Sequence, residues 1–343
     1  MDNGSVAAGR HDARRRRRGL TALAVAVAAL LGIAACGGGD NGGSSSGGAS
    51  NKPTTLKVGV IPIADVAPLY VGIKQGFFKQ ENLNVQPQLA EGGATITAQV
   101  VSGDLQVGFS NTTSLIIAAS KKLPVQIVAQ GVQGASSEDK AWDAVLSKKG
   151  SPVTDPKALE GKTVSVNNLN NVGPLTINNA MEKAGADFKK VKYVEVPFPD
   201  ANGALDTGRI DAAWVVEPFV SQGTAQGAKQ VLHPFESMGP NFTVATYFTT
   251  KQYSAKNKDV LDRFVRAINK SLTYSQSHPD VVRQVVPTYT KIPKPVAAKM
   301  LLPQWGADLN RPTIQQTVDL SQKYGFIKDK PDLNDLIRPS GGS

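Results

Sequence analysis

The chain has 343 residues, with 38 Lys and Arg against 28 Asp and Glu, and a formal net charge of +10. Six of the arginines lie in the first 35 residues; beyond them 32 basic and 26 acidic residues remain, and the basic ones form only scattered pairs such as Lys121-Lys122. The absence of a basic cluster argues against nucleic-acid binding. A single cysteine, Cys36, excludes an internal disulfide.

The first 35 residues have the pattern of an export signal. Arg14 to Arg18 precede an uncharged run over 19–35, which ends in small residues. The sequence Ile-Ala-Ala-Cys at 33–36 resembles the lipobox of bacterial lipoproteins, which implies that Cys36 becomes the lipidated first residue of the mature chain. Three alternatives stay open: a short membrane anchor, a plain cleavable signal with an incidental cysteine, and twin-arginine rather than Sec export.

The segment after Cys36 predicts a tether. Residues 37–50 include seven glycines and four serines, a composition typical of a flexible coil that buries no core. We therefore assign 1–35 to the signal and 36–52 to the lipidated cysteine and its tether.

Strand and helix patterns then alternate along the chain. We predict strands over 56–63, 84–89, 105–109 and 125–129, and helices over 68–74, 93–101 and 113–120. Such βαβα alternation indicates a mainly parallel sheet with helices on both faces.

The same order restarts at residue 159. Strands are predicted over 164–166 and 193–196, a helix from Pro174 to near Gly185, and a polar stretch at 200–203 that leads into another helix. Residues 208–214 parallel residues 103–109, which aligns Thr112 with Glu217, although two α/β halves can echo each other by coincidence. Two such lobes predict a ligand cleft between them, at the carboxyl ends of the strands.

Two extended segments, 143–147 and 244–249, are predicted to carry the chain into and out of the second lobe. Lobe 1 then covers 53–143, lobe 2 covers 144–246, and residues 247–343 return to lobe 1. Four helices are expected to pack back on lobe 1: 258–277, 280–286, 294–302 and 313–324.

Four motifs carry a family resemblance across the two lobes. They are Gly76 to Leu83, Ser102 to Gly108, Leu159 to Val164, and Ile210 to Ala213 followed by Glu217-Pro218-Phe219. Together they resemble the nitrate/sulfonate/taurine-type substrate-binding proteins of ABC importers, a group that also takes thiamine-pyrimidine precursors.

The resemblance implies a type II periplasmic-binding-protein fold, two hinge crossings and closure on a small molecule. It also implies a monomer without a cofactor that delivers its ligand to a membrane permease and its ATPase, from a lipid anchor on the outer face of the membrane. A tether would keep the binder near its permease at high effective concentration. A ligand-sensing lipoprotein that reports to a membrane receptor is the alternative.

Polar residues at the loop-to-helix junctions are the candidate ligand contacts. The free N–H groups of helix N-termini favour anions, whereas two carboxylates in the set favour an amine or a ring N–H. The candidates are Asp65, Ser110, Asn111, Thr112, Asn170, Asn171, Trp214 and Glu217.

Each candidate also has a structural interpretation. Asp65, Asn111 or Thr112 could cap a helix, Trp214 could pack in a core, and Glu217 could bond a helix terminus or the hinge. If the internal alignment is right, we expect Thr112 and Glu217 to face each other across the cleft.

Catalysis and metal binding are not expected. The three histidines, His11, His233 and His278, show no spacing of a metal site or a triad. A pyrimidine-synthesising branch with the same fold relies on cysteine and histidine residues that this chain lacks.

Overall fold

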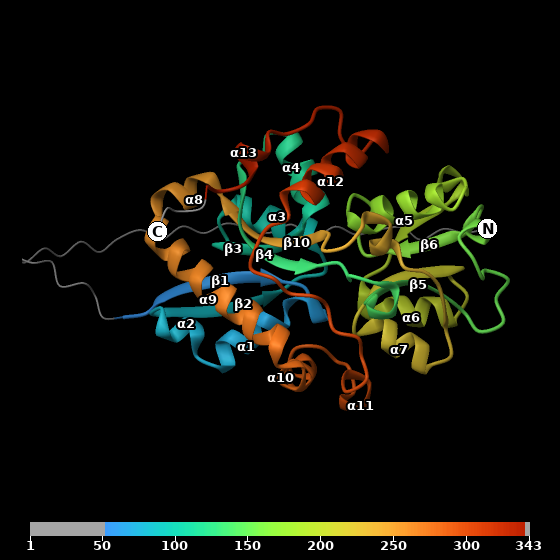
Figure 1. Cartoon of the computed structure of the whole chain (residues 1–343), viewed down its shortest axis with the longest axis horizontal. Helices are drawn as coiled ribbons and strands as arrows, with labels where there is room; N and C mark the ends of the chain where they lie inside the picture. Colours follow the sequence, from blue (N-terminus) through green and yellow to red (C-terminus); the bar gives the residue numbers. More distant parts are fainter. Residues whose placement is uncertain (1–51, 340–343) are drawn as a thin grey trace, which may run out of the picture. The chain divides into compact units, whose positions relative to one another are not determined.

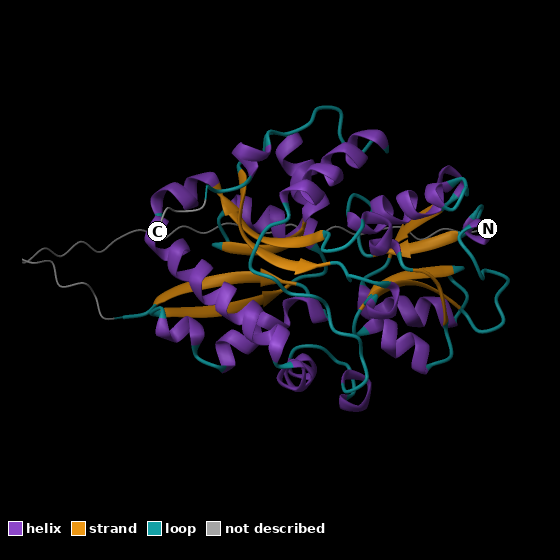
Figure 2. Ribbon diagram, viewed as in Figure 1, coloured by secondary structure: helices purple, strands orange, loops and turns teal. Residues whose placement is uncertain are grey.

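The computed structural model describes residues 52–339, which form two five-stranded sheets flanked by helices (Figures 1 and 2). The predicted export signal, Cys36 and residues 37–51 of the tether lie outside the described residues.

The first sheet has the strand order β2-β1-β3-β10-β4. Strand β1 is parallel to β2 and β3, while β10 runs antiparallel to β3 and β4. Its strands are β1 (Thr54–Val60), β2 (Leu83–Leu89), β3 (Val107–Asn111), β4 (Val125–Gln133) and β10 (Thr243–Thr250).

Short helices connect these strands. Pro68 lies in the first turn of α1, where its fixed φ suits a helix start, and Gly76 follows α1 with a φ of 76°. The connecting helices are η1 (Ala64–Val66), α1 (Ala67–Lys74), α2 (Phe77–Gln80), α3 (Gly93–Ser102) and α4 (Thr112–Ser120).

The second sheet repeats the arrangement with the order β7-β6-β8-β5-β9. Strand β6 is parallel to β7 and β8, and β5 is antiparallel to β8 and β9. Its elements are β5 (Asp143–Ser147), β6 (Thr163–Val166), α5 (Val172–Lys183), β7 (Lys192–Glu195), α6 (Phe198–Asp206), β8 (Ala212–Val216), α7 (Phe219–Ala225) and β9 (Lys229–Leu232).

The internal repeat predicted from the sequence is confirmed. Strands β3 and β8 occupy the same place in their sheets, and Gly103 and Gly208, with φ of 90° and 72°, stand at equivalent positions before them. Thr112 and Glu217 are accordingly the first residues after the two equivalent strands.

The C-terminal part is helical and touches both lobes. The long helix α9 buries a stripe of Leu261, Phe264, Ile268 and Leu272, spaced by three or four residues, and packs on α1 and α2. Helix α12 packs on α4 of lobe 1 and on α5 of lobe 2, and α11 packs on α7 of lobe 2. The expectation that the C-terminal helices pack on lobe 1 alone is therefore wrong. The bounds are α8 (Lys251–Lys256), α9 (Lys258–Ser277), α10 (Pro279–Val285), α11 (Lys294–Ala297), α12 (Arg311–Lys323) and α13 (Leu333–Leu336).

Several sequence-based boundaries are wrong. The segments 143–147 and 244–249 are strands within the sheets, and the predicted lobe boundaries at 143/144 and 246/247 fall inside them; the chain crosses earlier, between β4 and β5 and between β9 and β10. The polar stretch 200–203 lies within α6. The helix expected over 294–302 ends at Ala297, because the backbone of residues 301–304 bonds instead to Glu217 and Gln133.

Candidate ligand-binding cavity

A small cavity lies between the two lobes, next to the carboxyl ends of β3 and β8. It has room for about 30 Å³ of water-sized volume, enough for one or two waters, so an organic ligand requires its walls to move apart. Seven lining residues come from each lobe: Ile61, Ile63, Asp65, Phe109, Asn111, Val244 and Ala245 from the first, and Asn167, Asn171, Val172, Phe198, Trp214, Val216 and Phe235 from the second. None of these is Lys, Arg or His, so Asp65 is the ionisable group of this lining.

Asp65 is a buried carboxyl in the turn between β1 and α1. Its side chain is only 3% exposed, and its Oδ1 has no hydrogen-bond partner among residues 52–339. Burial raises the pKa of Asp65 well above its usual value; a bond from its own backbone N–H works the other way, and the negative charge of Asp143 adds to the rise. The side chain caps neither η1 nor α1, so the capping interpretation is wrong for this residue.

Asn111 and Asn171 stand at the start of one helix in each lobe. The Oδ1 of Asn111 accepts from the N–H of Ser114 at 2.8 Å, and that of Asn171 accepts from the N–H of Gly173 at 2.6 Å. Both therefore cap their helices, α4 and α5, as the capping interpretation predicts for Asn111. Because both side chains also line the cavity, capping orients them towards a ligand as well.

Trp214 forms an aromatic wall of the cavity and is also part of the lobe 2 core. Its ring packs against Phe198 and Phe235 at centroid distances of 5.5 and 5.8 Å. A Cβ on Gly173 would lie 2.6 Å from the ring, so the start of α5 approaches the indole closely because position 173 has no side chain. The packing interpretation is thus confirmed, and the exposed part of the ring faces the cavity.

A second buried acid stands behind this wall. The indole Nε1 of Trp214 donates to Oδ2 of Asp143 at 3.1 Å, and the N–H of Phe235 donates to the same oxygen at 3.2 Å. Burial raises the pKa of Asp143 to about 8, although these two bonds favour its ionised form. Asp143 thereby holds two aromatic residues of the cavity in place.

Thr112 and Glu217 do not line the cavity. The Oγ1 of Thr112 donates to the carbonyl of Thr243 at 2.9 Å, within lobe 1. The carboxylate of Glu217 accepts from the N–H and Oγ of Ser221, at 3.1 and 2.7 Å, and from the N–H of Leu301 at 3.2 Å. The expectation that they face each other across the cleft is therefore wrong, although their equivalence is right.

Glu217 instead connects the lobes. Its backbone carbonyl accepts from the N–H of Ala64 in lobe 1 at 2.9 Å, while its carboxylate holds the start of α7 and the backbone of Leu301. Burial raises the pKa of Glu217 to about 7, against the effect of the bonds from Ser221 and Leu301. The structural interpretation of Glu217 is confirmed.

Ser110 and Asn170 also lie outside the cavity lining. Ser110 is fully buried in β3, where its Oγ lies against Gly93. Asn170 is exposed, and its backbone carbonyl accepts from Ser114 Oγ at 3.1 Å, a bond from α4 to the loop before α5. Its side chain is not among those that line the cavity.

Sequence reasoning missed most of the apolar lining. Phe109 and Val216 could have been found, because Phe109 lies within β3 just before Ser110 and Asn111, and Val216 ends β8 just before Glu217. Phe198, Phe235 and Val244 come from a helix start and from the return crossing. Nothing local in the sequence indicates that these segments meet at the cavity.

In residues 52–339, no three His, Cys, Asp or Glu side chains gather where they could hold a metal ion. No helix in the same residues combines the length and the apolar character needed to cross a membrane.

Two sheets of matching topology, joined by two crossings and enclosing a cavity, define a two-lobed binding-protein fold. The chain belongs to the NMT1/THI5-like family, whose model matches residues 63–281, and the predicted family type is confirmed. The chain is 26% identical over 208 residues to the taurine-binding periplasmic protein of Escherichia coli K12, covering 60% of this chain and 62% of that one. It is 24% identical over 225 residues to the formylaminopyrimidine-binding protein of Halalkalibacterium halodurans, covering 64% and 65%.

The fold also matches solved structures. The alkanesulfonate-binding protein SsuA from Xanthomonas axonopodis pv. citri, bound to MOPS, superposes with a TM-score of 0.72 at 15% identity, covering 84% of this chain and 99% of that chain. The chain spans somewhat under two thirds of the curated relatives it matches. Another relative, 23% identical over 225 residues (62% of this chain and 64% of that one), is a 4-amino-5-hydroxymethyl-2-methylpyrimidine phosphate synthase of Aspergillus parasiticus, so the relatives include a protein named as an enzyme as well as binding proteins.

Proposed function

We propose that the protein is the solute-binding component of an ABC importer, which captures a small polar organic molecule between its lobes and delivers it to a permease and its ATPase. Family membership, the two-lobed fold and the cavity shared by the lobes support this role. The cavity holds no constellation of nucleophile and base, which supports binding rather than catalysis.

The ligand class is inferred from Asp65, whose Oδ1 has no hydrogen-bond partner among residues 52–339. An unpartnered buried carboxyl costs free energy until a donor reaches it, and no cationic side chain lines the same cavity. A ligand that brings its own N–H or ammonium group supplies that donor, whereas nitrate or a simple sulfonate has no donor to offer. The aromatic wall of Phe109, Phe198 and Trp214 favours a planar ring.

An aminopyrimidine of the thiamine-precursor type therefore fits better than the anionic ligands, with taurine, whose ammonium group could meet Asp65, as the next class. The test is a thermal-shift and calorimetric series on the full-length chain with formylaminopyrimidine, taurine, nitrate and methanesulfonate. We expect formylaminopyrimidine to raise the midpoint of unfolding most and nitrate not at all. Stabilisation by nitrate or methanesulfonate alone would overturn the ligand class, and stabilisation by none would leave the import role without support.

Membrane attachment through Cys36 completes the proposal. The lipobox-like sequence before Cys36 and the Gly/Ser-rich segment after it support a lipid anchor on the outer face of the membrane. Cys36→Ser is expected to move the chain from the membrane fraction to the soluble exported fraction. A plain cleavable signal predicts no change on this substitution, and a membrane anchor predicts that the chain stays in the membrane.

A further inference from the structure

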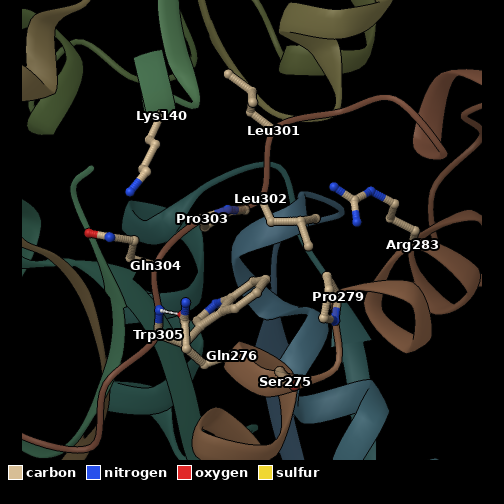
Figure 3. Close-up of a pocket in the computed structure, with 10 residues that line it drawn as sticks. All are labelled: Lys140, Ser275, Gln276, Pro279, Arg283, Leu301, Leu302, Pro303, Gln304 and Trp305. Carbon is tan, nitrogen blue, oxygen red and sulfur yellow. Dashed lines mark hydrogen bonds between the residues drawn. The ribbon is translucent and has the colours of Figure 1, made fainter. Parts of the chain in front are cut away.

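A second pocket, of about 280 Å³, lies outside the interlobe cavity. The end of α9, the start of α10, the extended segment 301–305 and Lys140 of the first crossing enclose it (Figure 3). Trp305 links it to a residue of the cavity, because its indole Nε1 donates to the backbone carbonyl of Asp65 at 3.0 Å. We call this the Trp305 pocket. It lies close to the lower end of the size range of small-molecule sites.

Three buried polar atoms of the Trp305 pocket have no partner among residues 52–339. They are Oγ of Ser275, whose residue is 1% exposed, Nε of Arg283 and Oε1 of Gln304. Each such atom costs free energy unless a water or a ligand bonds to it. All three belong to residues that line this pocket, while the atoms themselves are buried against the protein.

The charge of the Trp305 pocket is positive. Lys140 and Arg283 line it from opposite sides of segment 301–305 in Figure 3, and no acidic residue lines it. Asp280, whose side chain is 92% exposed, approaches Nη1 of Arg283 only to 3.9 Å, and Nη2 donates weakly to the carbonyl of Met300 at 3.4 Å. The guanidinium thus makes only long contacts within residues 52–339, and its Nη donors can bond to an oxyanion.

The rest of the lining is apolar. Trp305 presents its ring to the opening, flanked by Pro279 and Leu302 (Figure 3). We propose that the Trp305 pocket is a second binding site, which takes a small organic anion: a carboxylate or sulfonate that the charges of Arg283 and Lys140 attract, with its oxygens at Arg283 and its apolar body against Trp305. This inference does not depend on the proposed function.

Benzoate is a suitable probe, with benzyl alcohol as its neutral match. We expect saturable binding of benzoate to the full-length chain by calorimetry, and no comparable binding of benzyl alcohol. Arg283→Gln should weaken benzoate binding about tenfold, since it removes a charged donor, and Lys140→Gln should weaken it by a smaller factor, since it removes an exposed attracting charge. Arg209→Gln, an exposed arginine outside both pockets, should leave it unchanged.

Three results would overturn the proposal. The first is the absence of saturable benzoate binding, which would mean that the unpartnered atoms bind water only. The second is equally tight binding of benzyl alcohol. The third is an affinity for benzoate that falls in Asn111→Ala, which alters the interlobe cavity, and not in Lys140→Gln. Because Lys140 is exposed, its substitution keeps the test valid even if Arg283→Gln fails to fold.

Discussion

The interlobe cavity and the Trp305 pocket have opposite chemistry, although Trp305 bonds to the backbone of Asp65 in the cavity. The cavity contains Asp65, three asparagines and an aromatic wall, and no cationic side chain lines it. The Trp305 pocket contains Lys140 and Arg283 and no acidic lining residue. The donors that would attract an anion are therefore outside the cavity in which the family fold predicts the ligand.

This difference separates two expectations that the sequence left in conflict. Helix starts at the cleft favoured an anion, while Asp65 favoured an amine or a ring N–H. In the structure, the helix-start N–H groups of Ser114 and Gly173 are already bonded to Asn111 and Asn171, and the carboxyl of Asp65 is the group left without a partner. The acid therefore decides the chemistry of the cavity.

The largest expected effect is a pH dependence of stability that arises from the acids around the cavity. Burial raises the pKa of Asp143 to about 8 and of Glu217 to about 7, from 3.8 and 4.5, and also raises that of Asp65. The folded chain binds these protons more tightly than the unfolded chain. Stability is thus fully present below about pH 4 and falls, by about 1.4 kcal/mol per pH unit for each acid, as the pH rises through the folded pKa values.

Urea unfolding of the full-length chain at several pH values between about 5 and 8 measures this slope. Asp143→Asn and Glu217→Gln should each flatten it, whereas Arg283→Gln in the Trp305 pocket should not. An unchanged slope in Asp143→Asn would show that this carboxyl is ionised in the folded protein.

The next effect concerns the ligand itself. Asp65→Asn replaces an acceptor that can carry a charge by a neutral amide of the same size, so the loss should be about 1.5–3 kcal/mol of binding free energy for a nitrogen-bearing ligand. Stability should stay the same or rise, because an unpartnered buried carboxyl is removed. Calorimetry with formylaminopyrimidine measures the first effect and urea unfolding the second. If Asp65→Asn binds formylaminopyrimidine as tightly as the unsubstituted chain does, the donor groups of the ligand do not bond to Asp65.

A backbone change tests the aromatic wall. Gly173→Ala brings a methyl group to 2.6 Å from the ring of Trp214, so we expect a loss of about 1–3 kcal/mol in unfolding free energy and weaker ligand binding. Gly203→Ala is the matched control: Gly203 lies inside α6 with nothing within 4 Å of the added methyl, so stability should rise by about 0.5–1 kcal/mol. If Gly173→Ala changes neither the unfolding free energy nor the ligand affinity, the ring of Trp214 can shift to accommodate the methyl group.

The fold could be predicted from the sequence wherever the signal is local. Pro68 at the start of α1, Gly76 after it and the spaced apolar residues of α9 each act within a few residues. The internal repeat was readable for the same reason. The crossings were misplaced because an extended apolar segment has the same sequence pattern whether it is a connector or a central strand. Only its pairing with neighbouring strands distinguishes the two.

The site could be predicted only in part. Asn111 and Asn171 were readable because a cap bonds within its own turn. Thr112 and Glu217 were misassigned because their partners, Thr243 and Leu301, are 131 and 84 residues away. Equivalent positions in the two lobes have the same backbone arrangement, but contacts with distant segments give their side chains different roles.

The smallest expected effect tests whether contacts between the lobes matter away from the two pockets. Lys323 of α12 pairs with Glu182 of α5 across the lobes, and Lys330 pairs with Asp319 within the C-terminal part; in both pairs the side chains are about half exposed. Exposed pairs contribute about 0.2–1 kcal/mol at most, so Lys323→Ala and Lys330→Ala should each lower the unfolding free energy by the same small amount. A clearly larger loss of stability or of ligand affinity in Lys323→Ala alone would show that the arrangement of the two lobes depends on the Lys323–Glu182 pair as well as on the residues around the cavity.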